Sequence, residues 1–244
     1  MIKEALQYIT DLKEAAMNPK VLEINGRTYC DRRLNPYDKE LMARPIQAST
    51  LTALVDYIKN CSGELRSGMI CHVESPVKVS LYSELTQERK RENLFECNAI
   101  VPKFRFDSWY DQESFLIEMR ADFVSAGDLE TILKIAGNVQ SGSTKNCVDD
   151  GVSQQTTIKS GVASRADIIP PNPACLTPYR TFLEIPQPDG LFVFRIGERN
   201  GEPSFKIVEA EGGLWRNQAM QYIKSYIEQQ LEEIDMTDSI TIIA

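Results

Sequence analysis

The only histidine in the sequence, His72, is the residue best suited to acid–base chemistry. A histidine can serve as a general base toward a thiol, a hydroxyl or a water molecule. The adjacent Cys71 is a poor nucleophile for it, because consecutive residues of a strand point to opposite faces of the sheet. The GxSxG motif of serine hydrolases is also absent from the sequence. We therefore interpret His72 as an ordinary strand residue and predict that the chain is not an enzyme.

The cysteines do not form a metal-binding pattern. No two of them make a CxxC pair, and the adjacent Cys71 and His72 do not have the spacing of a zinc site. In a chain without a secretion signal, such cysteines are expected to be reduced thiols. The six are Cys30, Cys61, Cys71, Cys97, Cys147 and Cys175. We predict free thiols and no bound metal.

The sequence does not complete a calcium-binding or a phosphate-binding motif. Asp149-Asp150-Gly151 begins like a calcium loop but lacks the further ligands and the distal glutamate, so an Asp-Gly turn is the simpler interpretation. The sequence contains neither a GxxxxGK[ST] phosphate loop nor a GxGxxG motif after a strand. We predict no cofactor.

Basic residues supply the candidate contacts to partners. Arg89, Lys90 and Arg91 form a short basic cluster that could be a solvated loop tip, meet an acidic face of another subunit, or grip phosphates. Arg180 and Arg195 lie among predicted strand residues, where an arginine is usually paired. Each of these two is a candidate for ion pairing at an interface.

Composition limits the partners. The chain has 244 residues, a net charge of −8 and a pI of about 4.9. This acidic balance disfavours direct nucleic-acid binding without excluding it. No apolar run is long enough to cross a bilayer, and the N-terminus is amphipathic rather than a secretion signal. We expect a cytoplasmic protein that does not enter a membrane.

The N-terminal residues predict an arm. Residues 2–17 place apolar side chains on one helical face, and Asn18-Pro19 ends this helix. Asn25-Gly26 then joins two short strands into a hairpin. Residues 31–48 contain prolines and are expected to be irregular. We predict an arm over residues 1–48 and a main domain over residues 49–244.

The first half of the main domain alternates between helices and strands. Ser49 or Thr50 is positioned to cap a helix. Residues 69–102 predict a strand pair whose tip, Glu84 to Glu92, carries six charges in nine residues and should project into solvent. A helix is expected over about 111–124. Residues 125–128 fit a capping box at the start of the next helix.

The second half is organised around a predicted antiparallel meander between residues 178 and 215. Its strands are expected at 181–185, 191–196 and 205–208, with the tight turn Asn200-Gly201 before the last. Trp215 should anchor the following helix, 214–233, against this meander. The chain then ends in a β-prone segment, whose isoleucines Ile240, Ile242 and Ile243 could pair with the exposed sheet edge of a neighbour.

Several segments resemble a family of tailed-phage and prophage proteins of uncharacterised function, distantly similar to the prophage protein YfdQ. They are GDLETILKIAGNV, DDGVSQQTTIKSGVA, LTPYRTFLEIPQPDGLFVFRI and VEAEGGLWRNQAMQYIKSYIEQQL. The likeness runs from about residue 49 and is strongest in the last third. It implies a phage-encoded, intracellular accessory protein. That family has no established catalytic residues, so the resemblance assigns none here.

These observations predict an α+β fold with antiparallel sheet, packed helices and a projecting charged β-hairpin. Our first functional hypothesis is a homo-oligomeric accessory or scaffolding protein. The order of elements is loosely similar to the major capsid fold of tailed phages, which is an analogy of fold only. The second is a binding module that captures a host protein or a nucleotide signal, or assists phage recombination. An enzyme is the third. Candidate interface residues are Arg89, Lys90, Arg91, Ile240, Ile242 and Ile243.

Overall fold

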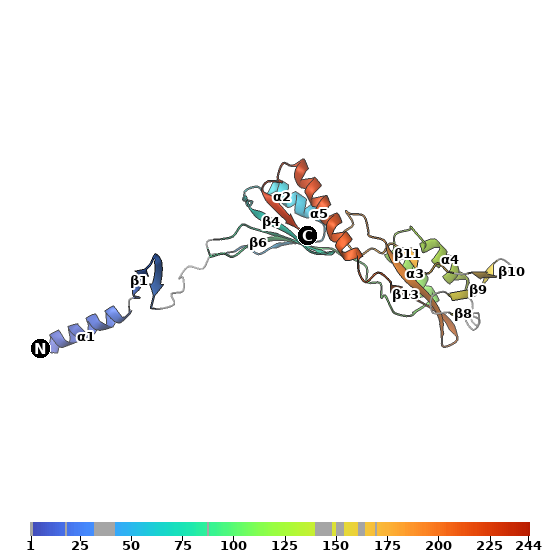
Figure 1. Cartoon of the computed structure of the whole chain (residues 1–244), viewed down its shortest axis with the longest axis horizontal. Coiled ribbons are helices and arrows are strands. Elements are labelled where there is room, and N and C mark those ends of the chain that lie inside the picture. Colours follow the sequence, from blue (N-terminus) through green and yellow to red (C-terminus); the bar gives the residue numbers. More distant parts are fainter. Residues whose placement is uncertain are drawn as a thin grey trace. The chain divides into compact units, whose positions relative to one another are not determined.

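The computed structural model describes residues 2–17, 19–31, 42–86, 88–139, 148–149, 154–160, 164–168 and 170–244. The chain forms two compact units, residues 1–42 and residues 43–244. Helices and mixed sheets occur together, which confirms the predicted α+β class (Figure 1). Strand β3 (Ile46–Ala48) belongs to the sheet of the second unit, although residues 31–48 were expected to be irregular.

The first unit is a helix followed by a two-stranded hairpin, as predicted. Helix α1 covers Ile2–Met17, and strands β1 (Val21–Ile24) and β2 (Arg27–Cys30) pair in antiparallel register. The turn residues Asn25 and Gly26 have φ values of 52° and 72°. Asn and Gly tolerate this left-handed conformation better than other residues, which is why the turn forms here.

The first core of the second unit lies on a five-stranded sheet with the order β14-β4-β5-β6-β3. The central strands β4 (Met69–Ser75), β5 (Lys78–Tyr82) and β6 (Asn93–Asn98) are antiparallel. The edge strands β3 and β14 (Ile240–Ile243) run parallel to their neighbours, so this sheet is mixed rather than purely antiparallel.

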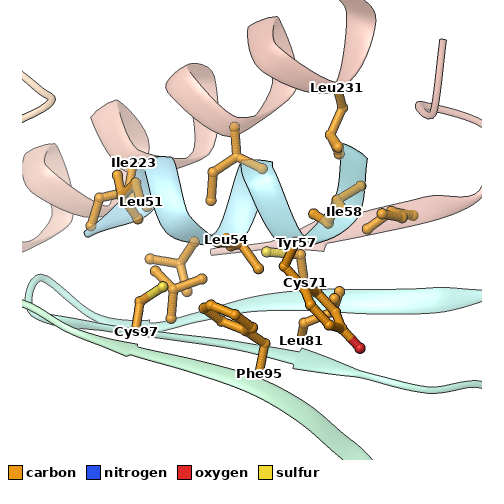
Figure 2. Packing of buried hydrophobic residues seen from close by; sticks show 14 of the residues in the cluster. Leu51, Leu54, Tyr57, Ile58, Cys71, Leu81, Phe95, Cys97, Ile223 and Leu231 are labelled. Carbon is orange, nitrogen blue, oxygen red and sulfur yellow. The ribbon is translucent and has the colours of Figure 1, made fainter. Parts of the chain in front are cut away.

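Helices α2 (Leu51–Asn60) and α5 (Trp215–Glu233) cover one face of that sheet (Figure 1). The Thr50 side chain accepts a hydrogen bond from the backbone N–H of Ala53, which confirms the predicted cap. Figure 2 shows Leu54 and Tyr57 of α2 facing Phe95 of β6, and the Tyr57 and Phe95 ring centroids are 5.0 Å apart. Apolar burial between helices and sheet therefore holds this core together.

The second core lies on a four-stranded sheet with the order β11-β12-β13-β7. Its strands are β7 (Tyr110–Asp111), β11 (Ala174–Leu176), β12 (Gly190–Arg199) and β13 (Glu202–Glu209). Helices α3 (Gln112–Asp122) and α4 (Leu129–Asn138) contribute buried residues to it. At its centre the Phe115 ring stacks against Phe194 and Phe205, with centroid distances of 5.8 and 5.2 Å.

The predicted meander is correct in two strands and wrong in the third. Asn200 and Gly201 have φ values of 52° and 83°, and they join β12 to β13 as expected. Residues 181–185 form no strand; instead Phe182 and Ile185 insert into the first core. Pro186 and Pro188 follow closely and lack the N–H that a sheet ladder needs. Strand β11 takes the third place beside β12.

The expected capping box before α4 is also wrong. The N-cap residue is Asp128, and its side chain makes no cap hydrogen bond. Its Oδ2 instead accepts from the backbone N–H of Cys175 at 2.8 Å, which ties β11 to the start of α4. Ser125 is not the N-cap residue, and its Oγ donates to Glu130 Oε1 at 3.4 Å.

A small three-stranded sheet, with the order β10-β9-β8, completes the described strands. It consists of β8 (Val148–Asp149), β9 (Gln154–Ser160) and β10 (Ser164–Ile168). Strand β9 includes the segment 155–158 that the sequence indicated. The predicted turn at Asp150-Gly151 and the thiol of Cys147 lie outside the described residues.

Candidate interaction surfaces

Cys71 and His72 lie on opposite faces of β4, as strand geometry predicts. Cys71 is fully buried in the first core, and burial raises the pKa of its thiol to about 12. His72 is partly exposed on the face that the helices leave open, opposite Ser80 of β5 and Ile243 of β14. The two side chains therefore do not act as a thiol–imidazole pair.

Polar side chains form a connected cluster on this open face of the five-stranded sheet. The Ser80 hydroxyl donates to Glu74 Oε1, the Tyr82 hydroxyl donates to the same oxygen at 3.3 Å, and Lys78 Nζ lies 2.9 Å from Glu74 Oε2. Burial raises the pKa of Glu74, but the hydrogen bonds from Ser80 and Lys78 outweigh it and lower the pKa overall. Ser80 itself is fully buried, so it is not an accessible nucleophile.

No three His, Cys, Asp or Glu side chains in the described part of the chain are close enough together to hold a metal ion. Cys30, Cys61, Cys71, Cys97 and Cys175 are free thiols.

The basic cluster occupies the loop between β5 and β6. Lys90 forms an ion pair with Glu88, and Arg91 Nη1 donates to the Ser83 carbonyl at 2.7 Å. Arg89 is exposed and has a φ of 60°. Two of the three predicted contact residues are thus bonded within their own loop, and Arg89 extends the exposed basic surface.

The C-terminal isoleucines are placed differently from the expectation. Strand β14 pairs with β4 of its own chain, and Met69 N donates to the Ser239 carbonyl at 3.2 Å. Ile240 is buried and Ile242 packs against the first core, so these two side chains contact their own chain, while β14 remains an edge strand of the sheet. The tail pairs with its own chain because Ile240 and Ile242 bury apolar surface in the first core, to which α5 also contributes. Ile243 is 45% exposed.

Arg180 pairs within its own chain instead of across an interface. Its side chain is 8% exposed. Nη1 lies 3.1 Å from Glu209 Oε1, and Nη2 donates to the Pro188 and Asp189 carbonyls at 3.2 and 3.1 Å. Burial lowers the pKa of Arg180 to about 10, and the charge of Glu209 opposes this shift. The guanidinium also lies over the Trp215 ring, with Cζ 4.2 Å from the ring centroid.

Arg195 lies on the other face of the four-stranded sheet, directly opposite Lys206 of β13. Lys206 Nζ is 2.8 Å from Asp107 Oδ1 and 5.3 Å from the Trp109 ring centroid. Trp109 packs over Gly197, where a Cβ would come within 2.8 Å of the ring. Arg195 is therefore part of a basic and aromatic surface, separate from Arg180.

The first unit exposes apolar side chains on its helix and also on its hairpin, whereas the sequence indicated only an apolar helix face. Every side chain described between residues 2 and 31 is exposed, in the helix and in the hairpin alike. The large apolar ones are Ile2, Leu6, Tyr8, Ile9, Leu12, Met17, Val21, Leu22, Ile24 and Tyr29. The helical spacing of Ile2, Leu6 and Ile9 was the available signal for such a surface.

Sequence reasoning missed a second candidate site, at the start of α5. Gly212-Gly213 was interpreted only as the closing turn of the meander. Trp215 was expected to be a buried anchor, but it is only partly buried, and the guanidiniums of Arg180 and Arg216 both lie over its ring. The glycine pair directly before a long helix was the signal that could have indicated this site.

Comparison with known proteins supplies no relative: no protein family, no curated protein and no solved structure matches this chain. Among the helices of the described residues, none combines the length and the apolar character that a membrane crossing requires.

Proposed function

We propose that this protein works by homo-oligomeric assembly, with the N-terminal unit making the contact between copies. The observation that carries the proposal is the exposed apolar surface of α1 and of the β1–β2 hairpin. An isolated helix of this length is only marginally stable in water, and a two-stranded hairpin is marginal at best. Both elements therefore need a surface against which to bury their apolar side chains.

A second copy of the same chain is the partner that fits best. Each copy offers an arm, and closed symmetry lets one type of contact serve every copy. Strands β3 and β14 are the two edges of the five-stranded sheet, so each copy also offers edges that can accept a further strand. Edge pairing together with the apolar helix face would give an interface of mixed hydrogen-bonded and hydrophobic character.

The setting of this assembly follows from the resemblance to tailed-phage and prophage proteins. We propose a phage-encoded accessory or scaffolding protein in the host cytoplasm, for which a capsid-like lattice is one form of assembly. A host or phage protein as partner is the alternative, in which case the chain is a binding module.

The test is the mass of the full chain in solution, measured by light scattering at micromolar concentration. The parent should exceed the 27.6 kDa of one chain. The double variant Leu6→Glu, Ile9→Glu places two charges on the apolar face of α1 and should shift the mass toward one chain. Its matched control is Lys3→Gln, Gln7→Glu, which makes the net charge more negative by the same two units on the opposite face and should assemble like the parent.

Two outcomes would contradict the proposal. A parent that is already monomeric means that the arm docks on its own chain or on another protein. A parent whose assembly survives Leu6→Glu, Ile9→Glu means that the interface lies elsewhere. Circular dichroism of each variant checks that the main unit remains folded.

A further inference from the structure

The N-terminus of α5 lacks the usual side-chain cap. Leu214 is the N-cap residue and makes no side-chain hydrogen bond, and the first turn contains no acidic residue. Gly212 and Gly213 precede it with φ values of 60° and 84°, a backbone conformation that favours glycine. A helix of 19 residues carries a partial positive charge at this end. The terminus therefore has the electrostatic character that attracts an anion.

Two buried donors beside this terminus lack an acceptor. Among the described residues, neither Arg180 Nε nor Trp215 Nε1 has a hydrogen-bond partner, and both atoms are shielded from solvent. They belong to groups in direct contact, since Arg180 Cζ lies 4.2 Å from the Trp215 ring centroid. A buried donor without an acceptor costs about 1–3 kcal/mol. Two such donors at one helix N-terminus point to an acceptor that the described residues do not provide.

Arg216 also lies over the Trp215 ring. Its Cζ lies 5.0 Å from the Trp215 ring centroid, and its Nη1 occupies the space that a Cβ on Gly213 would need. Arg216 is exposed, so its guanidinium can move away from Gly213 without disturbing the core. The glycine loop is thus a cradle closed by one mobile cation.

The charges around the cradle nearly balance. Glu209 is paired with Arg180, and Glu211 adds a second carboxylate that favours the charged form of Arg180, while Arg216 opposes it. The Asp189 carboxylate is directed to Cys175, with Oδ2 3.7 Å from Sγ. Two guanidiniums and the helix terminus therefore oppose two nearby carboxylates, which predicts a modest affinity for an anion.

We propose that the cradle formed by Gly212, Gly213 and the N-terminus of α5 binds a phosphate group, either free or carried by a nucleotide. Arg216 swings off Gly213 and binds the phosphate oxygens from outside. The amides of Leu214 and Arg216 already donate to the Glu211 and Gly213 carbonyls, so the other amides of the first turn bind the phosphate, which can approach closely because the glycines have no Cβ. The opened cradle gives the orphan donors of Arg180 and Trp215 the oxyanion acceptor that they lack.

The test uses the two tryptophans, Trp109 and Trp215, as internal reporters. The full chain is labelled with fluorotryptophan, and its two fluorine resonances are assigned with Trp215→Phe. Inorganic phosphate is titrated against sodium chloride at equal ionic strength. The Trp215 resonance should shift saturably with phosphate and not with chloride, while the Trp109 resonance stays in place.

Two variants test where the phosphate binds. Arg216→Gln should weaken the phosphate response about tenfold or more, since a charge-assisted hydrogen bond is lost. Arg199→Gln, which removes an exposed arginine at the far end of β12, should leave the response unchanged. A nucleoside monophosphate that saturates at lower concentration than phosphate identifies a nucleotide, and equal concentrations identify free phosphate.

The proposal is overturned by any of three results. The Trp215 resonance could respond equally to chloride and phosphate, it could shift only together with Trp109, or its response could survive Arg216→Gln undiminished. Each would mean that the arginine–tryptophan stack is a closed structural contact.

Discussion

At the residue scale, the cysteines differ in chemistry although the sequence gives them no distinguishing motif. Burial raises the pKa of the Cys97 thiol to about 12, and the nearby Glu184 adds to the shift. Burial also raises the pKa of the Cys71 thiol to about 12. Cys30 is exposed on β2. Because the thiolate is the reactive form, these environments separate inert thiols from reactive ones.

We expect iodoacetamide at pH 8 to modify the exposed Cys30 of the native protein on the order of 10³-fold faster than Cys71 or Cys97, because burial keeps the reagent away from these two thiols and their raised pKa keeps them protonated. Peptide mapping by mass spectrometry measures each rate. In denaturant the three should react alike, which is the control. Comparable native rates at Cys30 and Cys71 would show that the first core opens readily.

At the element scale, Glu74 joins β4 to β5 on the open face of the five-stranded sheet. Its carboxylate accepts from Ser80 and Tyr82 and pairs with Lys78. The native pKa lies below its usual value despite the burial. A carboxyl group with a depressed native pKa stabilises the fold above its unfolded pKa, about 4.3, and this contribution is lost as the pH falls through the native pKa.

We expect Glu74→Gln to lower the free energy of unfolding by about 1 kcal/mol at pH 7, a value reduced for partial solvent exposure. The difference from the parent should shrink as the pH falls below about 4.3. Urea unfolding at several pH values measures it. The control is Glu84→Gln, since the Arg66–Glu84 pair is long, at 3.8 Å, and exposed. A pH-independent difference would mean that Glu74 acts by packing rather than by charge.

Elements with local signals could be predicted from the sequence. The spacing of apolar residues gave α1 and α2, and the Asn-Gly pairs gave both tight turns, because each signal lies within a few residues. Pairing between distant segments carries no local signal. The pairing of β14 with β4 and the replacement of residues 181–185 by β11 were therefore missed. Both depend on which apolar surface is nearest in the fold.

The candidate sites were harder to predict than the elements. The arginine at 180 was identified as a paired residue, but its partner Glu209 and its stacking on Trp215 come from β13 and α5. Trp215 was interpreted from its size as an apolar anchor, whereas its ring makes cation–π contacts with two guanidiniums. Residue type alone does not distinguish these two environments.

At the scale of the whole second unit, the segment 177–189 connects the two cores. Its first residues pair with the end of α3, where Tyr179 N donates to the Asp122 carbonyl at 2.8 Å. Its middle enters the first core through Phe182, and the Thr181 hydroxyl donates to the Pro76 carbonyl between β4 and β5. Glu184 Oε1 accepts from Thr52 N at 3.2 Å, near the start of α2. One segment thus has contacts in both cores.

Arg180 lies in that segment, so it should couple the stability of the two sheets. Arg180→Met keeps much of the apolar volume but removes the ion pair with Glu209 and both carbonyl hydrogen bonds. We expect the free energy of unfolding to fall by about 2 kcal/mol. This is less than for a fully buried ion pair, because Glu209 keeps some solvent access. This loss of stability should affect the second core. The first core should keep its stability because Phe182 remains packed in it.

Native-state hydrogen exchange measures this separation, in phosphate-free buffer so that no anion binds at α5. In the parent, the slowest amides of β5 and of β12 should share one opening free energy, because the cores unfold together. In Arg180→Met, the β12 amides should open at lower free energy than those of β5, whereas Arg199→Met should behave like the parent. If β5 and β12 already differ in the parent, the two cores are independent and the segment 177–189 is only a tether.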